Sequence, residues 1–167
     1  MEINTLHHHF LTCNSVSTDT RKIKKNDMFF ALKGHNFNGN EYAKEALAKG
    51  AKNVIIDEDL NPGLKGTILV NSVLETLQKL ATYHRIYLNI PIIAITGSNG
   101  KTTTKELINA VLSKAYQTTA TIGNLNNHIG VPLTLLSMDE NTEIGIVEMG
   151  ANHQKEIELL CNIALPD

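Results

Sequence analysis

The apolar and polar positions of this chain alternate in a way that predicts two α/β segments in succession. Short apolar runs bounded by turn residues predict strands, and longer stretches with apolar side chains at helical spacing predict helices. In the first segment, strands are predicted at 27–32, 54–56 and 67–70, and helices at 41–49 and 73–87. In the second segment, strands are predicted at 92–95, 117–121 and 144–147, with helices after the first strand, after Pro132 and at 154–163. Alternating strands and helices are typical of an α/β fold with a mainly parallel sheet.

A proline marks the division between the two segments. Pro91 follows a long helical pattern, and the residue before a proline disfavours helical backbone, so a new element starts there. We therefore expect two domains, residues 1–88 and 89–167, with no sheet that runs through both. The chain ends at Asp167, where the alternation predicts a further strand, so we expect the second domain to be truncated.

A glycine-rich turn, Thr96-Gly97-Ser98-Asn99-Gly100-Lys101-Thr102-Thr103, follows the apolar strand at 92–95. Glycines allow successive N–H groups to turn inward around an anion, and the N-terminus of the following helix adds positive potential. Lys101 would neutralise the outer phosphates of ATP, and the Thr102 hydroxyl would ligate a phosphate-bound Mg²⁺. The turn is shorter than the common G-x-x-x-x-G-K-[ST] pattern, which has glycine where this chain has Ile95. The order of strand, turn and helix favours phosphate binding over an ordinary turn.

A carboxylate lies at the end of the strand predicted at 144–147, where Glu148 follows the apolar run. In open α/β sheets, ligands collect at the carboxyl ends of the strands. An acid there, beside a phosphate-binding loop, is placed to bind Mg²⁺ directly or through water. The alternative is a surface glutamate that ends a strand.

Composition and charge exclude several classes of function. The 167 residues are 42% hydrophobic and carry a net charge of −2 with acids and bases interspersed, so no basic stripe predicts nucleic-acid binding. No segment predicts a membrane span or a secretion signal. Cys13 and Cys161 stand far apart in apolar contexts, which indicates reduced core thiols in a cytoplasmic protein. The run at 7–9 of three histidines predicts an exposed N-terminal helix, because consecutive helical side chains cannot share one metal-binding face.

The chain resembles the Mur ligases, the amide-forming enzymes of peptidoglycan precursor synthesis. The resembling segments are Thr96–Thr103, Gly123–Leu136, Glu148–His153, Ser17–Arg21 and Phe29–Gly39. The resemblance implies a three-domain enzyme, of which residues 1–88 would be the UDP-substrate-binding domain. Residues 89–167 would be the truncated start of the central ATP-binding domain.

The resemblance also implies a reaction. ATP would phosphorylate the terminal carboxylate of UDP-N-acetylmuramoyl-tripeptide, and the amine of D-alanyl-D-alanine would attack the resulting acyl phosphate. Within the family, the segment at 123–136 favours this pair of substrates. The expected cofactors are ATP and Mg²⁺, the expected state is a monomer, and the 167-residue chain alone is expected to lack ligase activity.

Individual residues receive roles from the same resemblance. Lys101 and Glu148 would be catalytic, and Thr102 with Glu148 would bind the metal. The ATP-binding residues would be Gly97, Ser98, Asn99, Gly100, Lys101, Thr102 and Thr103. The UDP-substrate-binding residues would be Thr18, Thr20, His35, Asn36, Phe37, Asn126, Asn127 and His153. From the residues alone, the first five of this last set indicate an ordinary strand and turn, and the asparagines indicate local capping of a polar turn.

Three alternatives stay open. The first is a sister amide ligase, either the diamino-acid-adding Mur enzyme or a folylpolyglutamate synthase, which share the short ATP loop. The second is a non-catalytic nucleotide-binding or regulatory module. The third is a P-loop NTPase of unrelated function, which would not bind a UDP-sugar through residues 1–88.

Overall fold

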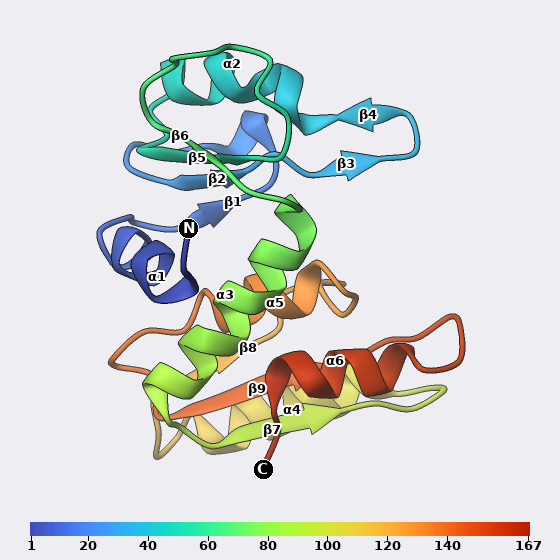
Figure 1. Cartoon of the computed structure of the whole chain (residues 1–167). Helices are drawn as coiled ribbons and strands as arrows, with labels where there is room; N and C mark the ends of the chain where they lie inside the picture. The colour runs from blue at the N-terminus through green and yellow to red at the C-terminus, as the bar shows by residue number, and fades with distance from the viewer. The chain divides into compact units, whose positions relative to one another are not determined.

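A computed structural model describes all 167 residues and divides the chain into two compact units, Met1–Leu77 and Gln78–Asp167. Each unit contains its own sheet, and no sheet runs through both (Figure 1). The division falls within the helix α3 (Val73–Leu88), whereas the sequence predicts a boundary after residue 88. The α/β class with mainly parallel sheets is confirmed.

The first unit is built on a four-stranded parallel sheet with the strand order β1-β2-β5-β6. Its strands are β1 (Val16–Ser17), β2 (Met28–Phe30), β5 (Asn53–Ile56) and β6 (Thr67–Leu69). The two central strands are the most buried, as expected of a parallel sheet covered on both faces. The three longer strands lie where the apolar runs predict them, and β1 was not predicted because it has only two residues.

Helices surround this sheet. They are α1 (Ile3–Leu11), the short 3-10 helices η1 (Thr20–Lys22) and η2 (Gly39–Tyr42), α2 (Ala43–Ala48) and the first turn of α3. The small side chains of Ala43 and Ala46 let α2 pack closely on Phe29 and Val54 in the core. Gly50 takes a φ of 104° just after α2, a left-handed conformation that ends the helix and that glycine adopts readily.

A small antiparallel hairpin, formed by β3 (Lys33–Gly34) and β4 (Phe37–Asn38), extends beyond the edge of the four-stranded sheet in Figure 1. The sequence did not predict it. Gly39 ends the hairpin at a point of close backbone approach, where a Cβ atom would lie 2.4 Å from the carbonyl oxygen of Leu32. Only glycine fits there without a shift of the backbone.

The second unit contains a three-stranded parallel sheet with the order β7-β9-β8. Its strands are β7 (Ile92–Ile95), β8 (Thr118–Ala120) and β9 (Ile144–Glu148), and its helices besides α3 are α4 (Lys101–Leu112), α5 (Gly130–Leu135) and α6 (Glu156–Ala164). Helix α4 packs on one face of the sheet, and α5 and α6, which contact each other, on the opposite face (Figure 1). This arrangement follows from right-handed β-α-β crossovers.

The structure corrects three sequence predictions. Helix α5 begins at Gly130 and not after Pro132, because proline is tolerated in the first turn of a helix. The histidine run does lie on a helix, but His7 is buried beside Phe10, with ring centroids 5.8 Å apart. The two cysteines are free but only partly buried, so they are not core thiols.

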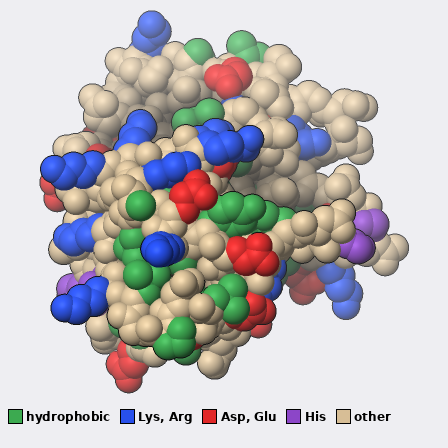
Figure 2. Space-filling view, turned by 90° about the horizontal axis from the view of Figure 1, so that it is seen from above, with side chains coloured by type: hydrophobic (Ala, Val, Ile, Leu, Met, Phe, Trp, Pro, Cys, Tyr) green, Lys and Arg blue, Asp and Glu red, His purple; other side chains and the backbone are tan.

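On the face shown in Figure 2, lysine and arginine side chains lie among aspartate and glutamate side chains. This mixture matches the small net charge of −2. No helix has both the length and the apolar character that crossing a bilayer requires.

Candidate active site

The glycine-rich turn at 96–103, which we call the phosphate loop after its expected ligand, connects β7 to α4. Gly100 is the residue before the helix and has a φ of 76°, and Gly97 has a φ of 153°, so both glycines use backbone conformations that other residues rarely adopt. No side chain caps the N-terminus of α4, which leaves the first N–H groups of the helix available to an anion. The Lys101 ammonium lies over the loop and donates to the Gly97 carbonyl oxygen at 2.7 Å.

Glu148 lies next to this loop because β9 pairs with β7, which places Ile95 opposite Glu148 at the carboxyl ends of the two strands. The Glu148 side chain is 2% exposed. The Thr102 hydroxyl donates to its Oε2 atom at 2.9 Å. A hydroxyl and a carboxylate are the hard oxygen donors that Mg²⁺ prefers, so the chemistry of these two predicted ligands fits that ion.

Asn126 lies on the other side of the same carboxylate. Its amide nitrogen donates to Glu148 Oε1 at 2.8 Å, and its backbone carbonyl accepts from the Gly150 N–H at 2.8 Å. A Cβ atom on Gly150 would lie 3.1 Å from the Asn126 amide carbon, so glycine leaves room for this side chain. The structure therefore places Asn126 as a partner of the acid.

A buried lysine is connected to Glu148 through Thr121. The sequence did not predict this lysine as part of the site. Lys105 on α4 is 1% exposed, and its ammonium donates to the Thr121 carbonyl oxygen at 2.6 Å and pairs with Glu106 at 2.9 Å. The Thr121 hydroxyl in turn accepts the Glu148 N–H at 2.9 Å. One sequence feature could have indicated that Lys105 is buried. It stands three residues before the apolar Ile108, on the face of α4 that the helical pattern assigns to the core.

A cleft of about 410 Å³ opens beside the loop and the acid. It is lined by Lys101, Asn124, Asn126, Asn127, His128, Gly150, Ala151, Asn152, Glu156, Leu159 and Leu160. The Asn127 side-chain oxygen accepts the N–H groups of Ile129 and Gly130 at 3.0 and 2.9 Å, which is the local capping role left open by the sequence. His153 does not line the cleft.

The backbone N–H of His153 donates to the Glu156 carboxylate at 3.0 Å, and that of Asn152 donates to the same oxygen at 2.6 Å. These two hydrogen bonds hold the pKa of Glu156 below its ordinary value, and the bond from His153 has the larger effect. The segment before α6 is thus fixed by one carboxylate that also lines the cleft.

The first unit contains two further cavities, and together they gather all five residues predicted to bind UDP in this unit. One cavity of about 490 Å³ is lined by Thr18, Asp19, Thr20, Arg21, Phe29, Phe37, Tyr42 and Glu45. The other, of about 400 Å³, is lined by Lys33, Gly34, His35, Asn36, Phe37, Asn38, Glu41 and Tyr42. Phe37 and Tyr42 line both cavities, and their rings stack with centroids 5.6 Å apart.

An ion pair borders the first of these cavities. The Arg21 guanidinium donates to both carboxylate oxygens of Asp19, at 2.9 and 2.8 Å. Hydrogen bonds from the Arg21 side chain and backbone lower the pKa of Asp19 to about 2. The Arg21 side chain is 84% exposed, so the ion pair lies at the surface.

Nearly the whole chain matches descriptions of known protein families. Residues 12–94 match the description "Mur ligase family, catalytic domain", and residues 95–167 match "Mur ligase middle domain". The chain belongs to the Mur ligase family.

Two curated relatives with the same name illustrate the similarity within the family. The chain is 45% identical over 156 residues to the UDP-N-acetylmuramoyl-tripeptide–D-alanyl-D-alanine ligase of Bacillus subtilis, covering 92% of this chain and 34% of the relative. It is 38% identical to the ligase of that name from Escherichia coli, with 94% and 34% covered. The chain spans about a third of the length of these curated relatives.

Solved structures of MurF ligases are also similar to this chain. MurF from Acinetobacter baumannii superposes with a TM-score of 0.87 at 31% identity, over 98% of this chain and 39% of that one. The MurF ligase from Thermotoga maritima in complex with ADP gives a TM-score of 0.82 at 34% identity, over 94% and 36%. A UDP-N-acetylmuramoyl-L-alanyl-D-glutamate–2,6-diaminopimelate ligase gives 0.51 at 20% identity, over 90% and 34%, and shares the fold alone.

Proposed function

We propose that this chain carries the UDP-substrate site and the ATP site of a ligase that joins D-alanyl-D-alanine to UDP-N-acetylmuramoyl-tripeptide. The observation that carries the proposal is the contact between Thr102 and the buried Glu148 at the mouth of a phosphate loop. It supports the proposal because it brings the predicted cation ligands together. The 45% identity to the ligase of that specificity supports the choice of substrates over those of a sister ligase.

The proposed reaction has two steps. An oxygen of the tripeptide's terminal carboxylate forms a bond to the γ-phosphorus of ATP as the bond to the bridging oxygen breaks, and ADP leaves. The amine of D-alanyl-D-alanine then attacks the acyl carbon, the bond from that carbon to the phosphate oxygen breaks, and the amine loses a proton. The products are the amide, ADP and inorganic phosphate.

Residues of the second unit would hold the reacting groups in place. The N–H groups from Gly97 to Thr103 and the Lys101 ammonium would bind the phosphates, which requires Lys101 to leave the Gly97 carbonyl. Thr102 and Glu148 would hold Mg²⁺. When bound, this ion supplies positive charge that offsets the repulsion between the phosphates and the carboxylate. Positioning of the two substrates supplies much of the remaining acceleration.

Residues of the first unit would bind the uridine diphosphate. The stacked Phe37 and Tyr42 rings offer an aromatic surface to a base, since Phe37 is 47% exposed. The hydroxyls of Thr18 and Thr20 line the cavity on one side of this pair, and His35 with Asn36 line the cavity on the other side. We also propose that Asn126 and Asn127 belong to the substrate side of the cleft beside the loop, Asn126 by positioning Glu148. His153 does not line this cleft, and we propose that it acts there through its backbone hydrogen bond to Glu156, which does.

Two further features belong to the proposal. We propose domains at 1–88 and 89–167, close to where the matched family descriptions meet, between residues 94 and 95. Proteolytic cleavage confined to 85–95 would support this boundary, and cleavage near 77 would contradict it. We also propose that the protein is a monomer. We infer a location in the cytoplasm, because the proposed reaction consumes ATP.

Calorimetric titration of the 167-residue chain with ADP and with UDP tests the proposal. Lys101→Ala should weaken ADP binding about tenfold or more and leave UDP binding intact, because it removes one electrostatic contact to phosphate. Phe37→Ala should do the reverse. A chain that binds ADP but no UDP would contradict the proposed UDP-substrate site. In a protein of the relatives' full length, Lys101→Ala should lower turnover on the order of a hundredfold.

A protein of that length separates the remaining alternatives. Amide synthesis from UDP-N-acetylmuramoyl-tripeptide and D-alanyl-D-alanine supports the proposed ligase. Nucleotide binding without any amide synthesis would indicate a non-catalytic module, and synthesis with a diamino acid in place of the dipeptide would indicate a sister ligase.

A further inference from the structure

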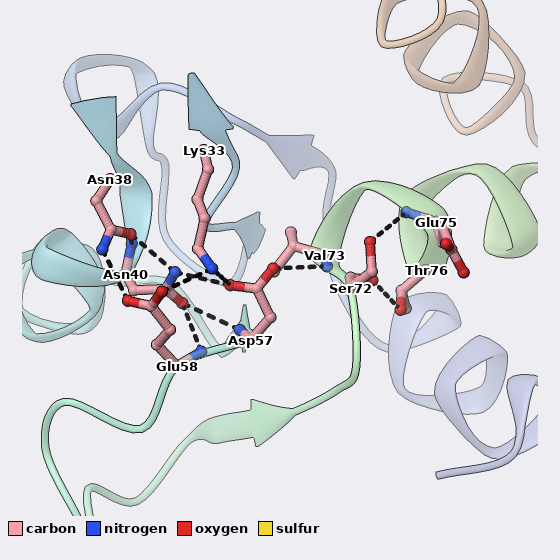
Figure 3. Close-up of polar contacts among 9 residues, drawn as sticks. All are labelled: Lys33, Asn38, Asn40, Asp57, Glu58, Ser72, Val73, Glu75 and Thr76. Atoms are coloured by element: carbon pink, nitrogen blue, oxygen red, sulfur yellow. Dashed lines mark hydrogen bonds and ion pairs between the residues drawn. The ribbon is translucent and has the colours of Figure 1, made fainter. Parts of the chain in front are cut away.

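Five polar side chains form a cluster at the base of the β3–β4 hairpin, which we call the clasp: Lys33, Asn38, Asn40, Asp57 and Glu58 (Figure 3). The first three come from the hairpin and from η2, and the last two directly follow β5. The hairpin needs support of this kind. Each of its strands has two residues, none of them is buried, and isolated two-stranded hairpins are marginally stable in water.

Asn40 is the centre of the clasp and is 1% exposed. Its amide nitrogen donates to Asn38 Oδ1 and to Asp57 Oδ1, each at 2.9 Å. Its amide oxygen accepts the backbone N–H groups of Asp57 and Glu58, at 3.0 and 3.3 Å. The side chain therefore donates and accepts at once, which a carboxylate or a hydrocarbon of the same size cannot do.

Lys33 supplies the charge of the clasp. Its ammonium lies 2.9 Å from Asp57 Oδ1 and 2.8 Å from Glu58 Oε1. Hydrogen bonds from Lys33 and then Asn38 lower the pKa of Glu58. Burial alone would raise the pKa of Asp57, but hydrogen bonds from Lys33 and Asn40 lower it below its ordinary value. Both acids are thus ionised at neutral pH and share one cation.

The clasp also reaches the first turn of α3. Asp57 Oδ2 accepts the backbone N–H of Val73 at 3.2 Å, and the Ser72 hydroxyl accepts that of Glu75 at 3.2 Å (Figure 3). The hairpin is therefore tied to the end of β5 and to a capped helix N-terminus of the same unit. Both are parts of the fold that the core already holds in place.

We propose that the clasp positions the β3–β4 hairpin for binding of a uridine nucleotide, and that Lys33 and Asn40 are positioning residues for that ligand. The proposal rests on the proposed function, since it takes the two cavities bordered by Phe37 as the uridine diphosphate site. Phe37 lies on β4, and the hairpin therefore shapes both cavities. Asn40 lines neither cavity, so a change there would displace the aromatic surface without removing a group that lines the ligand site.

The proposal assigns Lys33 to positioning of the hairpin and not to direct binding of the diphosphate. Lys33 lines the second cavity, so its ammonium could bind the diphosphate directly. Two carboxylates already neutralise it, however, and a bound phosphate would have to compete with both. The two roles predict different ligand dependence. A diphosphate contact matters for UDP and not for uridine, whereas a displaced hairpin weakens both equally.

The experiment compares Lys33→Met with Lys52→Met in the 167-residue chain. Lys52 is an exposed lysine of the same unit whose ammonium donates to the Thr12 carbonyl oxygen at 3.0 Å, and neither residue of this pair belongs to the clasp or lines either cavity. Calorimetry gives the dissociation constants for uridine and for UDP. Lys33→Met should raise both about fivefold, as expected for a lost charged contact, and Lys52→Met should change neither. Asn40→Asp, which replaces the donor by an acceptor facing Asp57, should raise both by at least as much.

Hydrogen exchange provides a second measurement that needs no ligand. In Lys33→Met, amides at 33–42 should exchange faster while those of β2 and β5 keep their rates, because the core of the unit is untouched. A loss that affects UDP alone would overturn the proposal in favour of a diphosphate contact. Unchanged exchange at 33–42 would also overturn it. If the unaltered chain binds neither uridine nor UDP, the proposed function of these cavities fails, and the exchange measurement still decides whether the clasp holds the hairpin.

Discussion

Replacing Glu148 by glutamine should separate binding of Mg²⁺ from folding. The carboxylate is 2% exposed and accepts hydrogen bonds from Thr102 at 2.9 Å and Asn126 at 2.8 Å. A glutamine amide can keep both contacts, because its oxygen can accept from Asn126 and its nitrogen can donate to the Thr102 hydroxyl. The change also removes a buried charge. We therefore expect the free energy of unfolding to stay within about 1 kcal/mol of the original value or to rise.

Nucleotide binding should respond differently. Loss of one charged ligand should weaken Mg²⁺-dependent ADP binding by about 3 kcal/mol, on the order of a hundredfold. Calorimetric titration with ADP in Mg²⁺ and in a chelator measures this difference. Glu143→Gln is the matched control, since Glu143 lies just before the start of β9, at the other end of the strand, and accepts the Gln117 N–H at 2.8 Å. An equal loss of affinity with and without Mg²⁺ would show that Glu148 only shapes the loop, and an unchanged Mg²⁺ dependence would refute its role as a ligand.

Three further predictions concern the second unit. Lys105→Met should lower the free energy of unfolding in urea by about 1–3 kcal/mol, because the buried Thr121 carbonyl loses its donor, and ADP affinity should fall with it. Gly130→Ala should lower the melting temperature by the equivalent of about 2 kcal/mol or more, because the new Cβ would lie 2.3 Å from the carbonyl carbon of Leu125. Burial lowers the pKa of His84 despite its bond to a backbone carbonyl, so below about pH 6.5 the unfolded chain binds a proton that the folded chain does not. Stability should therefore fall as the pH decreases from that value toward the folded-state pKa, and His84→Gln should abolish this part of the pH dependence in urea titrations.

The phosphate loop and the strands around it could be predicted because their signals are local. Apolar runs mark β7 and β9 in the sequence, and the parallel pairing rule brings Glu148 to the loop without further information. The roles of single polar residues were harder to predict. Asn126 and Asn127 are neighbours in one polar turn, yet one bonds a carboxylate 22 residues away and the other caps the helix that follows.

The β3–β4 hairpin could not be predicted for a physical reason. Its strands are too short for a period-two pattern, and none of their residues is buried, so no alternation of apolar and polar residues marks them in the sequence. What holds the hairpin is a set of polar contacts to Asp57 and Glu58, about twenty residues further along the chain. Such contacts depend on the tertiary fold and not on spacing. Lys105 is a similar case, because its partner becomes a neighbour only when β8 lies beside α4.

The hydrogen-bond partners of the carboxylates differ between the two units, and this difference indicates different roles. Asp57 and Glu58 share the Lys33 ammonium, so their negative charge is already compensated within the chain, and the simplest consequence is a rigid hairpin. Glu148 is more deeply buried than either, yet its partners Thr102 and Asn126 are both neutral donors. A buried charge without a cationic partner costs stability, and such a cost is expected where the charge serves a bound ligand. Charge removal should therefore destabilise the hairpin when made at Asp57 and spare the fold when made at Glu148. The opposite pattern, measured by urea unfolding of Asp57→Asn and Glu148→Gln, would contradict this assignment of roles.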